Sequence, residues 1–264
     1  MTTVGIVGCG AIGSSLALAI QEGRVPARLA GLTGRTRSRA EALARSLTPA
    51  PPLLDLPHLV QASDLVVEAA SVAAVAEIVP ACLRAQKDVF VISAGGLLGH
   101  EDWFSQAEAQ GTRILVPSGA IAGLDGVRAA AVGRIDSVML ISRRPPQALA
   151  GAPYVVEHGI DLDRLAEEKV VFEGSARDAC RGFPRHVNVP AALSLAGVGL
   201  DRTRVRILAV PGGSFNQHRI EVRGEFGRLS VDIENVPSPM NPRTGLLSIF
   251  SSIETLAEYA RARG

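Results

Sequence analysis

The chain has 264 residues, of which 47% are hydrophobic and 20% are charged, and its formal net charge is +1 at pH 7. This length can bury one large hydrophobic core or two modest ones. The near-neutral charge gives no electrostatic footprint for nucleic acid or for an anionic membrane. Three widely spaced cysteines without metal-ligand spacing favour a reducing compartment, so we expect a cytoplasmic protein with no metal site. No apolar run of about 18 residues occurs, and we expect no membrane-spanning helix.

The N-terminus carries a glycine motif between a strand and a helix. A short apolar strand, Val4–Val7, is followed at once by Gly8-x-Gly10-x-x-Gly13 and then by helical spacing from Ser14 to Ile20. In a dinucleotide site these glycines permit a tight turn, the approach of a pyrophosphate and close packing of the helix on the strand. A glycine-rich turn in another α/β protein is the alternative, but the order of the elements favours dinucleotide binding. We expect cofactor contacts from Gly8, Gly10, Ala11, Ile12 and Gly13.

Strands and helices alternate along the first part of the chain, which predicts a doubly wound parallel sheet of the Rossmann type. A capping box formed by Ser38 and Glu41 is expected to open the second helix, and Pro80 to kink or divide the third. Small residues at two strand ends would let a cofactor lie close to the backbone, or would only allow tight packing; they are Ala69, Ala70 and Ser93. Further strands are predicted at Ala27–Thr33, Leu65–Ala70, Val89–Ile92 and Arg113–Val116, and helices at Ala40–Ser46, Ser71–Ala85 and Glu101–Gln110.

The segment after the second strand predicts the cofactor preference. A dinucleotide site usually has an acid here that holds the ribose 2′-OH, but no Asp or Glu occurs between Glu22 and Glu41. A run of cations is more often only a solvated surface, yet here the missing acid and the added arginines together favour a 2′-phosphate. We therefore expect NADP to serve at least as well as NAD. Arg35 and Arg37 are expected next to the ribose, and Thr36 and Ser38 are expected to add hydroxyl donors.

The pattern changes after Pro117, where a small-residue turn leads into a helix from Leu124 to Val132. Several strands then follow without crossover helices, which indicates a mixed or antiparallel sheet. We predict a dinucleotide-binding domain over 1–116 and a second domain of α+β type, for substrate binding and oligomerisation, over 117–236. Its strands are expected at Ser137–Ser142, Val205–Val210, Arg219–Val222 and Leu229–Ile233, and its helices at Ala176–Arg181 and Val189–Ala196.

The C-terminal segment 237–264 contains a long amphipathic helix, predicted from Thr244 to Arg261. We expect this helix to return and pack on the first domain. Its apolar stripe would consist of Leu246, Leu247, Phe250, Ile253, Leu256 and Ala257.

His218 is the main candidate for catalysis. The alternation of side chains along a strand places it on the same face as Ile220 and Val222, towards the interior or a cleft. A lone inward histidine is more often a hydrogen-bonded core residue than a catalyst. His186 lies in a turn that opens a helix, where it and Asn188 could reach a ligand or merely cap. The remaining histidines, in segments expected to be loops, are His58, His100 and His158.

Seven segments together resemble the L-aspartate dehydrogenases, which oxidise aspartate for NAD biosynthesis. They occur in family order, cover nearly the whole chain, and depart from the family at His186, where Asn is usual, and at Pro190, where Ala is usual. The segments are Gly8–Gly13, Pro117–Asp125, Arg143–Pro146, Phe172–Arg177, Phe183–Val189, Asn216–Ile220 and Pro239–Thr244.

The resemblance implies that Ala122 and Asn188 contact the nicotinamide end of the cofactor and that His218 is the active-site residue. It also implies a second domain whose open sheet pairs between subunits, hence a homodimer. The expected substrate is a small dicarboxylic amino acid, and the cations available for its carboxylates are Arg143, Arg144, Arg185 and Arg243.

The expected reaction is NAD(P)-dependent oxidative deamination of L-aspartate through an imine to oxaloacetate and ammonia. A neutral imidazole near the amine or the attacking water is a suitable base. Two alternatives remain at this level: an oxidoreductase of the same architecture acting on another amino acid, imine or oxo acid, and a non-enzymatic dinucleotide-binding sensor.

Overall fold

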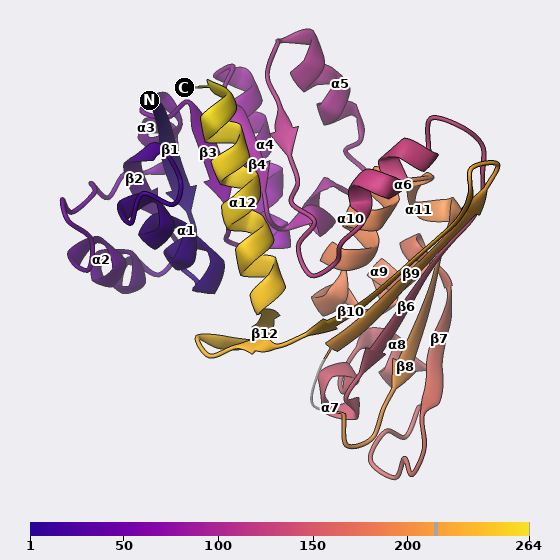
Figure 1. The fold of residues 1–264 in the computed structure, drawn as a ribbon. Coiled ribbons are helices and arrows are strands. Elements are labelled where there is room, and N and C mark those ends of the chain that lie inside the picture. The colour runs from indigo at the N-terminus through magenta and orange to yellow at the C-terminus, as the bar shows by residue number, and fades with distance from the viewer. Residues whose placement is uncertain (214–215, 264) are drawn as a thin grey trace. The chain divides into compact units, whose positions relative to one another are not determined.

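The computed structural model describes residues 1–213 and 216–263, and the chain divides into two compact units. The first unit comprises Met1–Pro117 and Ser248–Gly264, and the second comprises Ser118–Leu247. Each unit is built on its own five-stranded sheet (Figure 1). The predicted fold class, a Rossmann-type parallel sheet followed by an α+β unit with a mixed sheet, is confirmed.

The sheet of the first unit is parallel throughout and has the strand order β2-β1-β3-β4-β5. The order reverses between β1 and β3, and in open parallel sheets ligands bind beyond the carboxyl ends of the strands at this switch point. The glycine motif follows β1 directly, so it lies at that point. The strands are β1 (Thr2–Val7), β2 (Ala27–Thr33), β3 (Leu65–Glu68), β4 (Asp88–Val91) and β5 (Ile114–Leu115).

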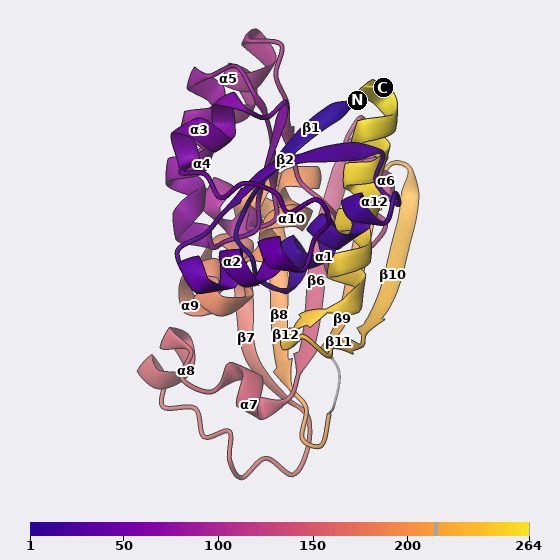
Figure 2. The same cartoon turned by 90° about the vertical axis from the view of Figure 1, so that its left-hand side faces the viewer.

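Helices cover both faces of this sheet (Figure 2). The buried side chains of α1, α2 and α12 form one core with β1 and β3, whereas α3 and α4 lie on the other face. The helices are α1 (Ala11–Gln21), α2 (Arg37–Arg45), α3 (Leu56–Gln61), α4 (Val72–Arg84), α5 (Asp102–Ala109) and α12 (Leu246–Arg263), with a 3₁₀ turn η1 (Ala94–Leu97).

Two predictions about helix α2 and the segment after it are wrong. Thr36, not Ser38, is the N-cap residue of α2, and Glu41 accepts a hydrogen bond from Arg37 Nε at 3.0 Å instead of closing a capping box. An ion pair one helical turn apart thus takes the carboxylate. His58 lies in helix α3 rather than in a loop, because the side chain of Asp55 accepts a hydrogen bond from the His58 backbone N–H and caps that helix.

The longer helices settle one alternative and correct one prediction. Of the two effects expected of Pro80, a kink or a division of the helix, the division is excluded, because α4 is continuous through Pro80. In α12, Phe250 is 58% exposed, whereas Ile249, Leu256 and Tyr259 are buried. Leu256 and Ala257 are buried as predicted, so the prediction is wrong in the first half of the helix, where Ile249 rather than Phe250 is buried.

The C-terminal helix is also tied to the first unit by polar contacts. The Tyr259 hydroxyl donates to Asp88 Oδ2 at 2.6 Å, and Arg263 Nη2 lies 2.7 Å from the same oxygen. Asp88 is 3% exposed, and a buried carboxylate needs such partners. These contacts, together with the buried side chains of α12, hold the last segment of the chain in the core of the first unit.

The second unit has a mixed sheet of order β10-β9-β6-β8-β7, in which only the β6 and β8 pair is parallel. Helices α9 and α10 lie against one face of this sheet (Figure 1). Strand β7 and the short helices α7, α8 and α11 were not predicted. The strands are β6 (Ile135–Arg144), β7 (Lys169–Ser175), β8 (Thr203–Ala209), β9 (Asn216–Gly224) and β10 (Gly227–Asn235), followed by the two-stranded β11 (Pro237–Ser238) and β12 (Asn241–Gly245).

The helices of the second unit come from three stretches of the chain. One precedes β6, two short ones lie between β6 and β7, and three more, with a 3₁₀ turn among them, lie between β7 and β8. They are α6 (Leu124–Ala130), α7 (Pro146–Leu149), α8 (Pro153–Glu157), α9 (Ala176–Gly182), η2 (Pro184–His186), α10 (Asn188–Ala196) and α11 (Gly199–Arg202).

Candidate active site

A cleft of about 560 Å³ lies at the carboxyl ends of β1, β2 and β3 in the first unit. Of the residues predicted to bind the cofactor, Gly8, Gly10, Arg35, Thr36, Ala69 and Ala70 line it. Ala11, Ile12 and Gly13 belong to the first turn of α1 behind the loop, and Ser93 is buried nearby. The structure therefore brings together three segments: the glycine loop Gly8–Gly13, the arginine segment Arg35–Arg39, and the small residues Ala69 and Ala70 after β3.

The glycine loop has the shape that a dinucleotide pyrophosphate requires. A Cβ at Gly13 would overlap the carbonyl oxygen of Gly8, and one at Gly8, whose φ is +106°, would overlap the Ala69 carbonyl. A Cβ at Gly10 would meet nothing within 4 Å, so this glycine borders open space. Two glycines thus hold the turn against α1 and β3, and the third leaves the loop accessible. These residues fit the phosphates of a dinucleotide.

The arginine segment contributes unequally to the cleft. Arg35, Thr36 and Arg39 line it, but Arg37 does not, because Arg37 turns to Glu41. Arg39 was not among the residues expected next to the ribose. The acid among the lining residues is Glu77, which comes from α4 rather than from β2.

Sequence reasoning missed Glu68, the last residue of β3, which is fully buried. Its carboxylate accepts hydrogen bonds from the backbone N–H groups of Ala70, Ser71 and Ser93 at 2.8, 3.0 and 2.9 Å, and from the Ser93 hydroxyl at 3.0 Å. Burial raises the pKa of Glu68, and these hydrogen bonds oppose that shift. One carboxylate thereby fixes the segments that follow β3 and β4. The signal that the sequence offered was an acidic residue at the end of an otherwise apolar strand.

In the second unit, His218 lies on the helix-covered face of the sheet. Its side chain is 2% exposed, and Ile220 and Val222 on the same face are fully buried. The Nδ1 atom of His218 lies 2.9 Å from the hydroxyl of Ser142 on the neighbouring strand β6. Burial is the largest cause that lowers the pKa of His218, and the charges of Arg144 and His186 add to it. Together they lower this pKa to about 3. The imidazole is therefore neutral over the physiological pH range.

His186 and Arg144 belong to the same cluster. His186 Nε2 lies 2.9 Å from the carbonyl oxygen of Ala148, and burial together with the charge of Arg144 lowers the pKa of His186 to about 4. Arg144 is 7% exposed and donates from Nη1 to Asn216 Oδ1 at 3.0 Å. The second unit thus places two neutral imidazoles, a hydroxyl and a guanidinium on one buried face. Neither Ser142 nor Asn216 was singled out from the sequence.

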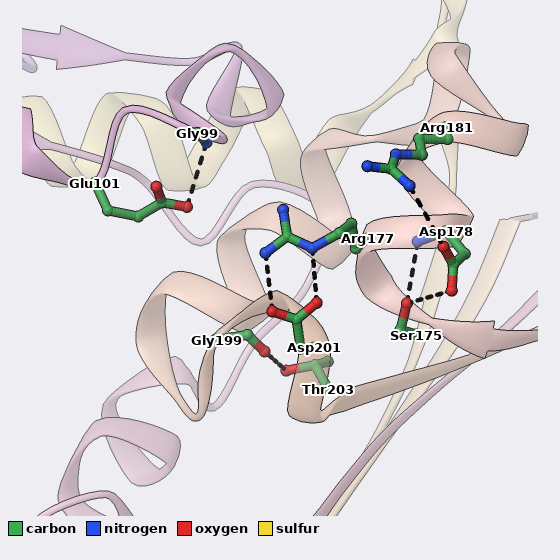
Figure 3. A network of polar contacts seen from close by, with 9 residues as sticks. All are labelled: Gly99, Glu101, Ser175, Arg177, Asp178, Arg181, Gly199, Asp201 and Thr203. Atoms are coloured by element: carbon green, nitrogen blue, oxygen red, sulfur yellow. Dashed lines mark hydrogen bonds and ion pairs between the residues drawn. The ribbon is translucent and has the colours of Figure 1, made fainter.

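Three further motifs have clear places in the second unit. Ala122 is exposed just before α6, and Asn188 is exposed as the first residue of α10. In the third motif, Ser175 caps α9, and Arg177 forms two hydrogen bonds with Asp201 of α11, at 2.6 and 2.9 Å (Figure 3). This third motif therefore joins two helices rather than contributing to the buried cluster.

The described residues contain no group of three His, Cys, Asp or Glu side chains that could hold a metal ion. Within residues 1–213 and 216–263, no helix is both long and apolar enough to cross a membrane.

Comparisons with known proteins match each part of the chain and the chain as a whole. Residues 8–117 match the family described as homoserine dehydrogenase, NAD binding domain, and residues 125–259 match the family described as aspartate dehydrogenase, C-terminal. The chain is 45% identical to an L-aspartate dehydrogenase of Methanosarcina mazei, over 97% of this chain and 96% of that protein. It is 44% identical to an L-aspartate dehydrogenase of Bradyrhizobium diazoefficiens, over 96% and 90%.

A solved structure is similar in fold over the length of the chain. The crystal structure of aspartate dehydrogenase from Thermotoga maritima superposes with a TM-score of 0.73 at 25% sequence identity, covering 100% of this chain and 97% of that one. A homoserine dehydrogenase from Thiobacillus denitrificans, at 14% identity and a TM-score of 0.64, shares the fold.

The lowered pKa of His218 predicts how stability depends on pH. An unfolded histidine binds a proton below about pH 6.5, whereas the folded one stays neutral down to about pH 3. Stability is therefore lost as the pH falls below about 6.5. Between pH 7 and pH 5 we expect the parent's free energy of unfolding to fall by about 2 kcal/mol more than that of His218→Gln. Urea denaturation at both pH values measures this difference.

His158→Gln is the control, because His158 is exposed, and this variant should lose as much stability as the parent. Equal losses in the parent and in His218→Gln would contradict the assignment of a buried neutral imidazole.

Proposed function

This chain belongs to the L-aspartate dehydrogenase family, and from that premise we propose that it catalyses the reversible oxidation of L-aspartate by a nicotinamide dinucleotide. The balanced reaction consumes aspartate, water and NAD(P)⁺ and yields oxaloacetate, ammonium, NAD(P)H and a proton. The observation that carries the proposal is the 45% identity over nearly the full length, together with a buried His218 in the second unit. A role in supplying NAD biosynthesis is part of the proposal and rests on the family resemblance.

His218 is the proposed proton acceptor. Loss of hydride from the α-carbon requires a neutral amine, so a base must take a proton from the ammonium group or from the attacking water. The Ser142 hydroxyl lies at Nδ1, which leaves Nε2 as the atom that we assign to this transfer. Ser142 fixes the orientation of the ring, as a hydrogen-bond partner on one nitrogen sets the tautomer of the other.

The residues proposed to hold the dinucleotide in the first unit line its cleft or begin the helix behind the glycine loop. The glycine loop and the backbone N–H groups at the start of α1 suit its pyrophosphate, and Ala69 and Ala70 let it lie near the backbone. Glu68 acts indirectly by fixing the segments after β3 and β4. When bound, the nicotinamide supplies the hydride acceptor. In the second unit, Ala122 and Asn188 are proposed nicotinamide contacts by family resemblance.

We propose that NADP serves at least as well as NAD. No acid follows β2 to repel a 2′-phosphate, and Arg35, Thr36 and Arg39 line the cleft at that position. A charge-assisted hydrogen bond contributes about 1.5–3 kcal/mol, so one arginine could favour NADP by roughly tenfold or more. Glu77 on α4 lines the same cleft, and its charge would reduce this preference.

The second unit is proposed to bind the substrate and to form a homodimer. The family resemblance implies pairing through the open face of its sheet. That face carries surface ion pairs, including Arg206 with Glu173 at 2.8 Å and Arg219 with Glu221 at 2.8 Å, which a second copy would cover. The three cysteines are free, which favours a cytoplasmic location.

The first functional prediction concerns the substrate. The enzyme should oxidise L-aspartate, or aminate oxaloacetate with ammonia, with a higher kcat/KM than for alanine, glutamate or malate. The absorbance of the reduced nicotinamide in the near ultraviolet follows each reaction. Equal or better turnover of a monocarboxylic amino acid would refute the proposed substrate class.

The second concerns His218. Replacing it by Ala should lower kcat by roughly 10²–10⁴, the range for loss of a general acid–base, while the Kd for NADP stays close to that of the parent. Stopped-flow turnover and cofactor fluorescence measure the two quantities. If His218→Ala binds cofactor and turns over within a few-fold of the parent, His218 is only a core residue.

The third concerns the cofactor. Arg35→Ala should lower kcat/KM for NADP by at least about tenfold and change that for NAD little, because NAD lacks the 2′-phosphate. Arg37→Ala is the matched control, since Arg37 pairs with Glu41 and does not line the cleft. A parent enzyme strongly selective for NAD, or an Arg35→Ala variant that loses both cofactors equally, would overturn the preference.

A further inference from the structure

The four arginines in family motifs have different environments in the second unit. Arg143 pairs with Glu168 at 3.0 Å and alternates with Arg144 along β6, so it faces away from His218. Arg185 and Arg243 are exposed. Only Arg144, among these four, is buried on the face that carries Ser142 and His218.

Arg144 is a buried cation without a carboxylate partner. Among the described residues, no Asp or Glu forms an ion pair with it, and its acceptor at Asn216 is a neutral amide oxygen 3.0 Å away. Its neighbours in the cluster, Ser142, His186 and His218, are all uncharged. A buried guanidinium that lacks an anion costs several kcal/mol in a protein interior. A ligand that carries a carboxylate would supply the missing charge.

The hollow beside Arg144 is small. It measures about 10 Å³ and is lined by Ser142, Arg144, His186 and apolar side chains of α9, α10 and β8, which is room for about one water molecule. A carboxylate that reaches the guanidinium must therefore take the place of a group already present. The amide of Asn216 is the acceptor that it can replace, because both present an sp² oxygen to Nη1.

We infer that Arg144 binds a carboxylate of the amino-acid substrate, and that Asn216 holds the guanidinium until this carboxylate replaces its amide oxygen. The inference rests on the proposed oxidation of aspartate for the identity of the ligand, but the anion site itself rests on the buried charge. Arginine suits the role because its planar fork can bind a carboxylate through two parallel hydrogen bonds.

The site has a consequence for His218. The charge of Arg144 contributes to the lowered pKa of His218, so a carboxylate on Arg144 cancels that contribution and raises the pKa of His218. Substrate binding thereby makes the imidazole a better base at the moment when it is needed. The charged groups that act on His218 are Arg144 and, when protonated, His186.

The first experiment measures binding without turnover. Isothermal calorimetry with succinate, which has two carboxylates and no amine, should detect binding to the parent enzyme and at least about 100-fold weaker binding to Arg144→Met, because charge-assisted hydrogen bonds are lost. Arg143→Gln, on the opposite face of the sheet, is the matched control and should bind succinate as the parent does. The KM for L-aspartate should rise by a similar factor in Arg144→Met alone.

A second variant covers the case in which Arg144→Met does not fold. Asn216→Asp places a carboxylate of the chain itself against Arg144, so it should raise the Tm and weaken succinate binding by at least about tenfold, whereas Asn216→Ala should leave succinate binding within a few-fold of the parent. Undiminished succinate binding in Asn216→Asp, or in a folded Arg144→Met, would overturn the inference.

The remaining outcomes distinguish the anion site from the proposed function. They also show whether Arg144 binds the α-carboxylate or the side-chain carboxylate. If the parent binds succinate through Arg144 but does not oxidise L-aspartate, the anion site stands and the proposed function fails. If Arg144→Met slows L-alanine as much as L-aspartate, Arg144 holds the α-carboxylate. If only L-aspartate is slowed, Arg144 holds the side-chain carboxylate.

Discussion

The alternation of side chains along β6 and β9 is the constraint on which the polar cluster of the second unit depends. Because successive residues of a strand point to opposite faces, Ser142 and Arg144 must share the buried face with His218, whereas Arg143 must leave it. The register of the antiparallel pair then sets Ser142 directly opposite His218. A shift of one residue in β6 would turn Ser142 and Arg144 to the other face, and a shift in β9 would do the same to His218. The hydrophobic residues between them, such as Leu140 and Ile220, make such a shift costly because they are fully buried.

The first unit also buries an ionisable side chain, but this one is acidic. Glu68 is buried at the end of β3, yet four hydrogen bonds at 2.8–3.0 Å satisfy it without a cation. Those bonds come from the segments that follow β3 and β4, so the carboxylate fixes the chain at this edge of the cofactor cleft. Arg144, by contrast, is buried with a neutral partner. The difference between a satisfied and an unsatisfied buried charge separates a structural group from a proposed ligand-binding one.

Much of this arrangement follows from local sequence patterns. The glycine motif, the boundaries of β2 at Ala27–Thr33 and the inward position of His218 depend on periodicity and turn chemistry, which short stretches of sequence carry. The errors arise where two local signals compete or where tertiary contacts decide. Glu41 had two possible partners, Ser38 and Arg37, and the sequence does not say which is chosen. Phe250 satisfies the helical stripe but is exposed, because the core of the first unit accepts the face that carries Ile249.

The cluster around His218 shows why sites are harder to predict than elements. Ser142, His186 and Asn216 come from β6, a 3₁₀ turn and the first residue of β9, and no spacing rule connects these segments. Burial also changes the chemistry of each group: an imidazole that would titrate near pH 6.5 in water has its pKa lowered to about 3 in His218. In the free protein such a base is weak, since a proton acceptor works best when its pKa lies near the operating pH. A dehydrogenase that must both keep the imidazole neutral and let it accept a proton needs its electrostatics to change when substrate arrives. A dicarboxylic amino acid carries the anion that a buried arginine lacks, so the same charge that selects this substrate class can also prepare the base.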